Sequence, residues 1–154
     1  MAPQLRWSVA CCICNVAKLA GVTEEVQSAF LWIRVESKHL PLDIGNRRVC
    51  ADGLRVLMPA EYLGPPLTLY RGTIAQERRH RRYGFSWTLD VAVARKFASK
   101  WTQEALSSEG IVLKTLARPE AILLVRQPVN YFDEGEVVVD PFQLDKVDVV
   151  ERLR

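Results

Sequence analysis

The spacing of hydrophobic positions changes after residue 64. Before that point apolar residues recur with a helical period, as they do along Val26–Ile33. Beyond the breaker Gly64-Pro65-Pro66, short apolar runs of strand length are separated by turn residues. The pattern predicts an α+β protein, with helices grouped early and mostly antiparallel strands after them.

The first part of the chain predicts two helices. An apolar stripe over residues 9–20 ends at Gly21, a residue that often follows the last turn of a helix. Thr23 is the expected N-cap of the second helix, because two glutamates follow it where the helix dipole favours negative charge. Pro41 ends this helix at or before Leu40.

A β-hairpin is expected next. Asp52-Gly53 lies between two short apolar runs, residues 47–51 and 54–58, and this dipeptide favours a type I′ turn.

The rest of the chain predicts six strands and one helix, and it contains one strongly basic loop at Ile74–Tyr83. We expect one domain, 1–154, with a mainly helical part (1–64) and a strand-rich part (65–154). The expected strands are Leu67–Arg71, Phe85–Thr88, Ile111–Leu116, Ala121–Val125, Glu136–Asp140 and Val147–Glu151, and the expected helix is Asp90–Thr102.

Composition is that of a folded protein. Hydrophobic residues make up 49% and charged residues 25% of the 154 positions, and the net charge of +3 does not by itself indicate nucleic-acid binding. No apolar run approaches the roughly 18 residues of a membrane helix, so we expect no membrane contact. The apolar stretch after Arg6 resembles a signal peptide faintly, but Asn15 and Lys18 interrupt it. We therefore expect a helix of the mature protein there.

The cysteines and histidines predict neither disulfides nor a metal site. His39 and His80 have no partner at metal-ligand spacing. The cysteines make a poor disulfide framework, and we expect them to be small buried hydrophobes in a reducing cytosol. The four cysteines are Cys11, Cys12, Cys14 and Cys50.

Phosphate loops, dinucleotide fingerprints and nucleophile elbows are absent from the sequence. One remaining feature is Arg71-Gly72 at a strand end, where a guanidinium suits phosphate oxygens. A second is Ser86 and Thr88, whose hydroxyls share one face of a strand. Taken separately, an arginine paired with a surface acid and strand-end caps for the next helix explain these residues better.

Two carboxylates form the third feature. Glu136 opens a valine-rich strand, and Glu134 precedes it by two residues, so both side chains can point to the same side. Paired carboxylates are used in glycosidic-bond chemistry, where one stabilises an oxocarbenium-like centre and the other handles the acceptor proton. An acidic turn facing water is the ordinary alternative.

Together, the order and spacing of these features resemble the Arg–Ser–Glu class of ADP-ribosyltransferases, the cholera-toxin-like group, over residues 67–152. The resemblance implies a fold of two mostly antiparallel sheets and NAD as co-substrate, without a metal. It implies that Arg71 binds NAD phosphate and that Gly72 offers its backbone to the nicotinamide amide. Ser86 and Thr88 would brace the site.

In the same resemblance Glu136 is the catalytic glutamate, which binds the nicotinamide-ribose 2′-hydroxyl. Glu134 would contact the acceptor. Trp87 and Phe97 are the candidates for the aromatic residue that stacks on NAD, with core packing favoured for Phe97. Compact members of this class are often toxins, effectors or phage proteins that modify host or defence machinery. The expected location is the cytoplasm, or that of a target cell into which the protein is delivered.

Three functions stay open on the sequence. The first is transfer of ADP-ribose from NAD to a protein, and the second is NAD glycohydrolysis by the same site. The third is a non-enzymatic nucleic-acid-binding module, because a basic run lies between Arg71 and Ser86. This run could also meet an acidic protein target or the NAD phosphates, and a solvated loop is its plainest explanation. Its arginines are Arg78, Arg79, Arg81 and Arg82.

Overall fold

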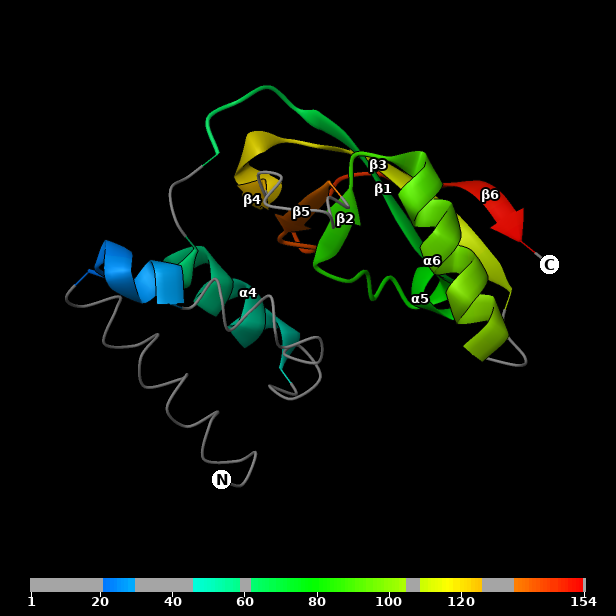
Figure 1. The fold of residues 1–154 in the computed structure, drawn as a ribbon, viewed down its shortest axis with the longest axis horizontal. Helices are drawn as coiled ribbons and strands as arrows, with labels where there is room; N and C mark the ends of the chain where they lie inside the picture. The colour runs from blue at the N-terminus through cyan, green and yellow to red at the C-terminus, as the bar shows by residue number, and fades with distance from the viewer. Residues whose placement is uncertain (1–20, 30–45, 59–61, 105–108, 126–134, 154) are drawn as a thin grey trace. The chain divides into compact units, whose positions relative to one another are not determined.

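The computed structural model of the chain describes residues 21–29, 46–58, 62–104, 109–125 and 135–153 (Figure 1). The chain divides into two compact units, Met1–Ala60 and Glu61–Arg154. This boundary lies beside the breaker at residues 64–66, and the organisation as one domain over 1–154 stays a prediction.

In the first unit, residues 24–29 are helical and Thr23 precedes them. The Thr23 hydroxyl accepts a hydrogen bond from the Val26 N–H at 3.5 Å, and the Thr23 carbonyl accepts one from the Gln27 N–H at 3.1 Å. The pKa of Glu25 is lowered by hydrogen bonds from the backbone and from the Thr23 hydroxyl. The predicted N-cap at Thr23 is therefore confirmed, whereas residues 9–20 and 30–40 lie outside the described residues.

The hairpin prediction at residues 47–58 is wrong, because the structure forms helix α4 there (Arg47–Leu57). Its buried apolar residues are one, three and four positions apart, which is a helical and not an alternating pattern. Asp52-Gly53 is a local turn signal, and the burial of one helix face outweighs it. The buried residues of α4 are Cys50, Ala51, Gly53, Leu54 and Leu57. Burial of Cys50 agrees with its predicted role as a small hydrophobe.

Asn46 begins α4, and its loss is expected to destabilise the helix. Its side-chain oxygen accepts hydrogen bonds from the backbone N–H groups of Arg48 and Val49, at 3.1 and 3.2 Å. We expect Asn46→Ala to lower the free energy of unfolding by about 1 kcal/mol in urea melts, since the N-terminal N–H groups lose this acceptor. Asn46→Asp keeps the acceptor and is the control. Equal stability of wild type and Asn46→Ala would contradict the assignment.

The second unit is built on one antiparallel sheet, in the order β4-β5-β2-β1-β3-β6 (Figure 1). The α+β class and the six predicted strands are confirmed, but the described strands form one sheet where two were expected. They do so because β2 pairs with both β1 and β5 and joins the two halves. The strands are β1 (Leu67–Ile74), β2 (Ser86–Thr88), β3 (Gly110–Ala117), β4 (Ile122–Val125), β5 (Glu136–Val139) and β6 (Val147–Leu153).

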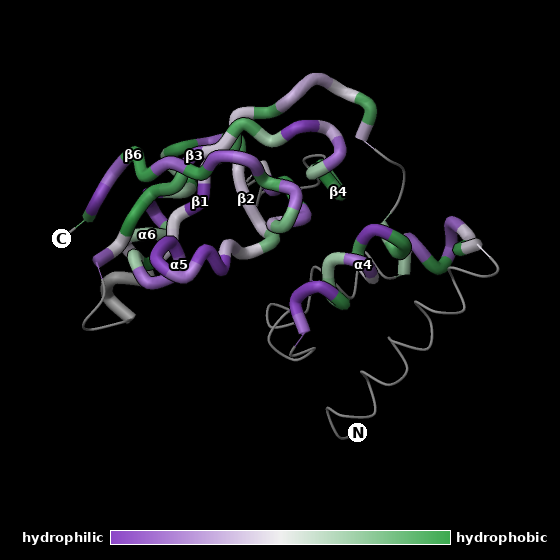
Figure 2. The backbone as a smooth tube through the Cα atoms, turned by 180° about the vertical axis from the view of Figure 1, so that it is seen from behind, coloured by the Kyte–Doolittle hydropathy of each residue, from purple (hydrophilic) through white to green (hydrophobic). Residues whose placement is uncertain are grey.

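Three helical segments accompany the strands. Helix α6 (Val91–Glu104) matches the predicted helix, and the short 3-10 helix η1 (Pro119–Ala121) separates β3 from β4 at the predicted break. The segment Ile74–Tyr83 was expected to be a loop throughout, but its first part forms α5 (Ala75–Arg79). Alanine, glutamate and arginine favour a helical turn, so a charged composition alone does not imply a loop. The hydrophilic stretch at α5 stands out in Figure 2.

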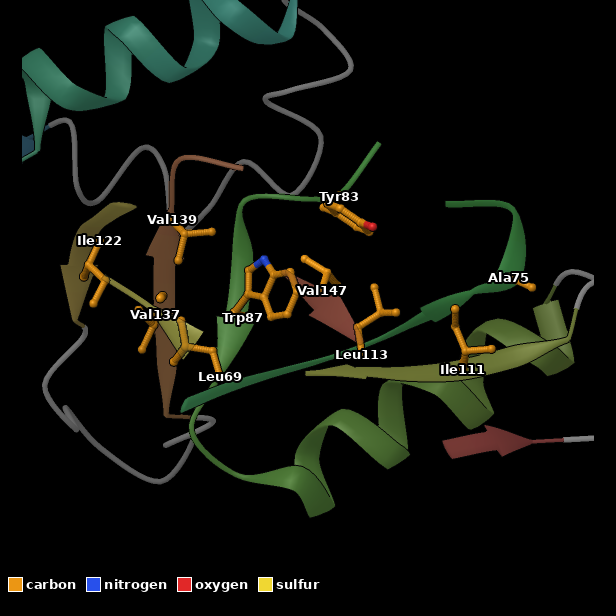
Figure 3. Close-up of a cluster of buried hydrophobic side chains, with 11 residues drawn as sticks. Leu69, Ala75, Tyr83, Trp87, Ile111, Leu113, Ile122, Val137, Val139 and Val147 are labelled. Atoms are coloured by element: carbon orange, nitrogen blue, oxygen red, sulfur yellow. The ribbon is translucent and has the colours of Figure 1, made fainter. Parts of the chain in front are cut away.

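The two faces of the sheet pack against different parts of the second unit. One face carries the main hydrophobic cluster, which includes Leu69, Trp87, Leu113, Val137 and Val139 (Figure 3). The other face is covered by α6, whose small residues pack tightly against β1 and β3. That second cluster contains Ala94, Ala98 and Val112, with Tyr70, Val91 and Leu153 beside it. Because side chains alternate along a strand, each candidate residue belongs to one face or the other.

Candidate functional site

The sheet brings the candidate residues onto three adjacent strands. Arg71 lies on β1, Ser86 and Thr88 form the ends of β2, and Glu136 opens β5. Since β2 is hydrogen-bonded to both neighbours, residues far apart in the sequence become close in space. Thr88 stands directly opposite Glu136 on one side and Tyr70 on the other.

The side chains of Arg71 and Glu136 nevertheless start from opposite faces. Arg71 pairs across strands with Leu113, a member of the main hydrophobic cluster, so both project from that face. Glu136 precedes Val137, which belongs to the same cluster, and therefore projects from the α6 face together with Thr88. The arrangement thus groups Glu136 with the β2 hydroxyls and separates it from Arg71.

Arg71 is held by Glu77, a residue that sequence analysis passed over. The Arg71 Nε and Nη2 atoms donate to the two Glu77 carboxylate oxygens at 3.1 and 3.3 Å. The same carboxylate accepts hydrogen bonds from the Thr73 hydroxyl and from the Gly84 N–H, the latter at 2.6 Å. Only 13% of the Glu77 side chain and 21% of the Arg71 side chain are exposed. Glu77 therefore joins β1, α5 and the chain before β2.

The guanidinium of Arg71 lies where β1 and β2 diverge. These strands share only the pair Tyr70–Thr88, while β1 pairs along its whole length with β3. Arg71 Nη1 donates to the Ser86 carbonyl oxygen at 2.8 Å. A Cβ added at Gly84 would contact the guanidinium, 2.8 Å from Nη1. Arg71 thus reaches from β1 to the backbone of β2 and takes the place of strand pairing there.

Thr88 has a structural role close to the start of α6, where the sequence alone favoured a helix cap. Its hydroxyl accepts a hydrogen bond from the Asp90 N–H at 3.1 Å, and the Asp90 carboxylate accepts one from the Ala92 N–H at 2.7 Å. Asp90 therefore caps the start of α6, and the Thr88 hydroxyl holds the backbone of this capping residue. Ser86 is half-buried, on the same face of β2 as Thr88.

Gly72 lies beneath α6. A Cβ at this position would meet the main chain of α6, 2.5 Å from the Ala98 nitrogen and closer still to the Ala94 carbonyl oxygen. Gly72 is buried and pairs with Val112 of β3. The absent side chain thus permits close packing of helix on sheet, which differs from the expected backbone contact with nicotinamide.

The two aromatic candidates differ in their burial. Trp87 is 2% exposed within the main cluster, and its indole N–H donates to the Gly84 carbonyl at 3.0 Å (Figure 3). Tyr83 packs against it edge-on, with ring centroids 6.4 Å apart. Trp87 is therefore a core residue and has no face to offer a ligand. Phe97, for which core packing was favoured, is 36% exposed on α6.

The second candidate carboxylate, Glu134, lies outside the described residues. Within the described part of the chain, no group of three or more His, Cys, Asp or Glu side chains is arranged to hold a metal ion. In that same part, no helix is both long enough and apolar enough to cross a membrane.

Comparisons with known proteins give no match to a family model, to a curated protein or to a solved structure.

Proposed function

We propose that the chain cleaves NAD at the bond between nicotinamide and ribose and transfers ADP-ribose to a protein side chain. The observation that supports this proposal is the placement of Arg71, Ser86 and Glu136 on the adjacent strands β1, β2 and β5. Their spacing in the sequence resembles the Arg–Ser–Glu transferases, and β2 pairs with the strands that carry the other two residues.

Glu136 is the residue that we assign to the chemistry. Positive charge develops on the ribose as the bond to nicotinamide breaks, and a carboxylate near the 2′-hydroxyl stabilises that charge. Nicotinamide leaves as a neutral molecule, so this step needs no strong acid. Glu136 is half-buried at the start of β5 and shares a face with the β2 hydroxyls, a suitable polar setting for a ribose.

Arg71 receives a different role from the one that the resemblance implies. Its guanidinium is already hydrogen-bonded to Glu77 and to the Ser86 carbonyl, and it projects from the other face. We assign to Arg71 the positioning of β2 relative to β1. The direct contact with NAD phosphate expected from the resemblance is not part of this proposal.

The acceptor side of the reaction rests on the resemblance alone. We propose a protein of a host cell or of a defence system as target, with Glu134 contacting the acceptor, and action in the cytoplasm. Water as the acceptor would give an NAD glycohydrolase with the same first step.

The test measures two products with the full chain. Wild type is expected to release nicotinamide from NAD and to label discrete proteins in a bacterial lysate when biotin-tagged NAD is supplied. Glu136→Gln is expected to lower nicotinamide release by on the order of 10²- to 10³-fold, because it removes the charge that meets the developing cation. Glu134→Gln is expected to lose protein labelling while keeping much of the release.

Glu120→Gln is the matched control, since Glu120 is an exposed carboxylate of the same unit. It should behave as wild type, and thermal melts establish that each variant is folded. Nicotinamide release without labelled protein would support the glycohydrolase instead. Neither product from folded wild type, or equal activity of wild type and Glu136→Gln, would refute the proposed chemistry.

A further inference from the structure

One short segment accounts for the net positive charge of the chain; it is here called the arginine run and defined as residues 78–82. It contains four arginines and His80. Removing these arginines from the net charge of +3 leaves −1, so the rest of the chain is slightly acidic. Arg79, His80, Arg81 and Arg82 are exposed, and Arg78 is half-buried. The run is therefore a local cationic surface on a nearly neutral molecule.

The arginines of the run have no carboxylate partner among the residues that the structure describes. The Arg78 Nε is buried and lacks a hydrogen-bond partner within that same part of the chain. Other cations of the second unit do form ion pairs: Arg95 with Glu151, Arg118 with Asp145, Lys146 with Asp148 and Arg152 with Glu109. Uncompensated like charges in sequence repel each other, and a bound polyanion would remove that repulsion.

The backbone of the run is ordered by hydrogen bonds. The N–H groups of His80, Arg81 and Arg82 donate to the carbonyls of Gln76, Arg78 and Glu77, at 3.1, 3.2 and 3.0 Å. Arg81 adopts a φ of +50° in this turn. The Glu77 carboxylate is tied in turn to β1 and to the chain before β2. The cations are thus presented from a fixed turn, which lowers the entropy lost when they bind a ligand.

We propose that the arginine run is a binding surface for the phosphate backbone of a nucleic acid. Four of the five residues of the run are arginines, whose planar guanidinium matches phosphate oxygens with two parallel hydrogen bonds and can stack on bases. This inference stands apart from the proposed NAD chemistry.

The density of charge favours nucleic acid over an acidic protein surface. Each strand of a DNA duplex carries one negative charge per about 3.4 Å of helix axis, and a single strand likewise carries one per nucleotide, so successive phosphates can meet successive arginines. Folded proteins usually intersperse charges of both signs on their surfaces and rarely present several carboxylates in such a row. Four cations within five residues therefore fit a phosphodiester chain better.

The experiment is a salt-dependent binding assay with a fluorescein-labelled oligothymidylate. For three or four neutralised phosphates, the logarithm of the binding constant should fall with the logarithm of salt concentration with a slope of about −2 to −3. The triple variant Arg79→Ala, Arg81→Ala, Arg82→Ala should lose affinity by about tenfold or more at low salt, and its slope should shrink by about 2.

The matched control removes three charges elsewhere, in the variant Arg95→Ala, Arg118→Ala, Arg152→Ala. It should keep the affinity within a few-fold, because these arginines are compensated by carboxylates. Equal losses in both triple variants, or wild type that does not bind the oligonucleotide, would overturn the proposal. Tighter binding of oligoglutamate through the same arginines would also overturn it, in favour of an acidic protein partner. Displacement of the oligonucleotide by NAD at a similar concentration would assign the run to the NAD phosphates instead. Circular dichroism melts confirm that each variant is folded.

Discussion

Glu77→Ala is expected to lower the free energy of unfolding of the second unit by about 3 kcal/mol, a large share of the stability of a small domain. The substitution removes the acceptor for the Arg71 guanidinium, the Thr73 hydroxyl and the Gly84 N–H at once. Both charged side chains are mostly buried, so water replaces the lost carboxylate poorly. Urea melts followed by circular dichroism measure the change.

A double-mutant cycle separates this pair from ordinary truncation. If Arg71 and Glu77 are coupled, Arg71→Ala combined with Glu77→Ala should cost less than the sum of the two single changes, by about 1–3 kcal/mol. Asp145→Ala is the control, because its ion pair with Arg118 is exposed and should contribute less than about 1 kcal/mol. Additive single effects, or a loss for Glu77→Ala no larger than for Asp145→Ala, would contradict the buried network.

The sequence predicted several strands closely, but it did not predict the contacts of Glu77 or the helix α4. Strands with apolar alternation and clear breakers were predicted within a few residues, as for Val147–Glu151 against the observed Val147–Leu153. Local patterns suffice there, because each strand buries one face. The hairpin at Asp52-Gly53 failed because a turn dipeptide is a short-range signal, whereas burial of one face of α4 depends on the whole segment.

The candidate site shows the same division. The sequence predicted Arg71, Ser86 and Glu136 at strand ends. This is confirmed for Ser86 and Glu136, which begin β2 and β5, but it is wrong for Arg71, because β1 continues to Ile74. Strand pairing places the three strands side by side. The face from which each side chain projects depends on register, and register was not readable from spacing alone. The role of Glu77 was missed because this residue directly precedes the arginine run, and its residue type there suggested a solvated charge. Only its tertiary contacts show that the Glu77 carboxylate is mostly buried and accepts hydrogen bonds from Arg71 and Gly84.

Gly72→Ala is the second change with a large expected effect, about 3 kcal/mol of lost stability. The added methyl group would lie 2.5 Å from the Ala98 nitrogen and 2.9 Å from the Ala94 carbonyl carbon, which are backbone atoms of α6. A side chain could rotate away from such a contact, but a helix backbone has to shift as a whole. In a domain of this size the loss corresponds to a fall in melting temperature of roughly 12–24 °C.

Two variants test whether the helix backbone is the cause. Thr68→Ala, an exposed position on the same strand, should change stability by less than about 1 kcal/mol, which controls for the strand propensity of alanine. Ala94→Gly should fail to rescue Gly72→Ala, because the obstructing atoms at Ala94 belong to its main chain. Rescue by Ala94→Gly, or a stable Gly72→Ala protein, would mean that α6 does not rest on β1 at Gly72. Nicotinamide release at the wild-type rate by folded Gly72→Ala protein would exclude Gly72 from close contact with the nicotinamide of NAD. Because Gly72 packs beneath α6, we expect release to fall only as far as the folded fraction of the Gly72→Ala protein falls.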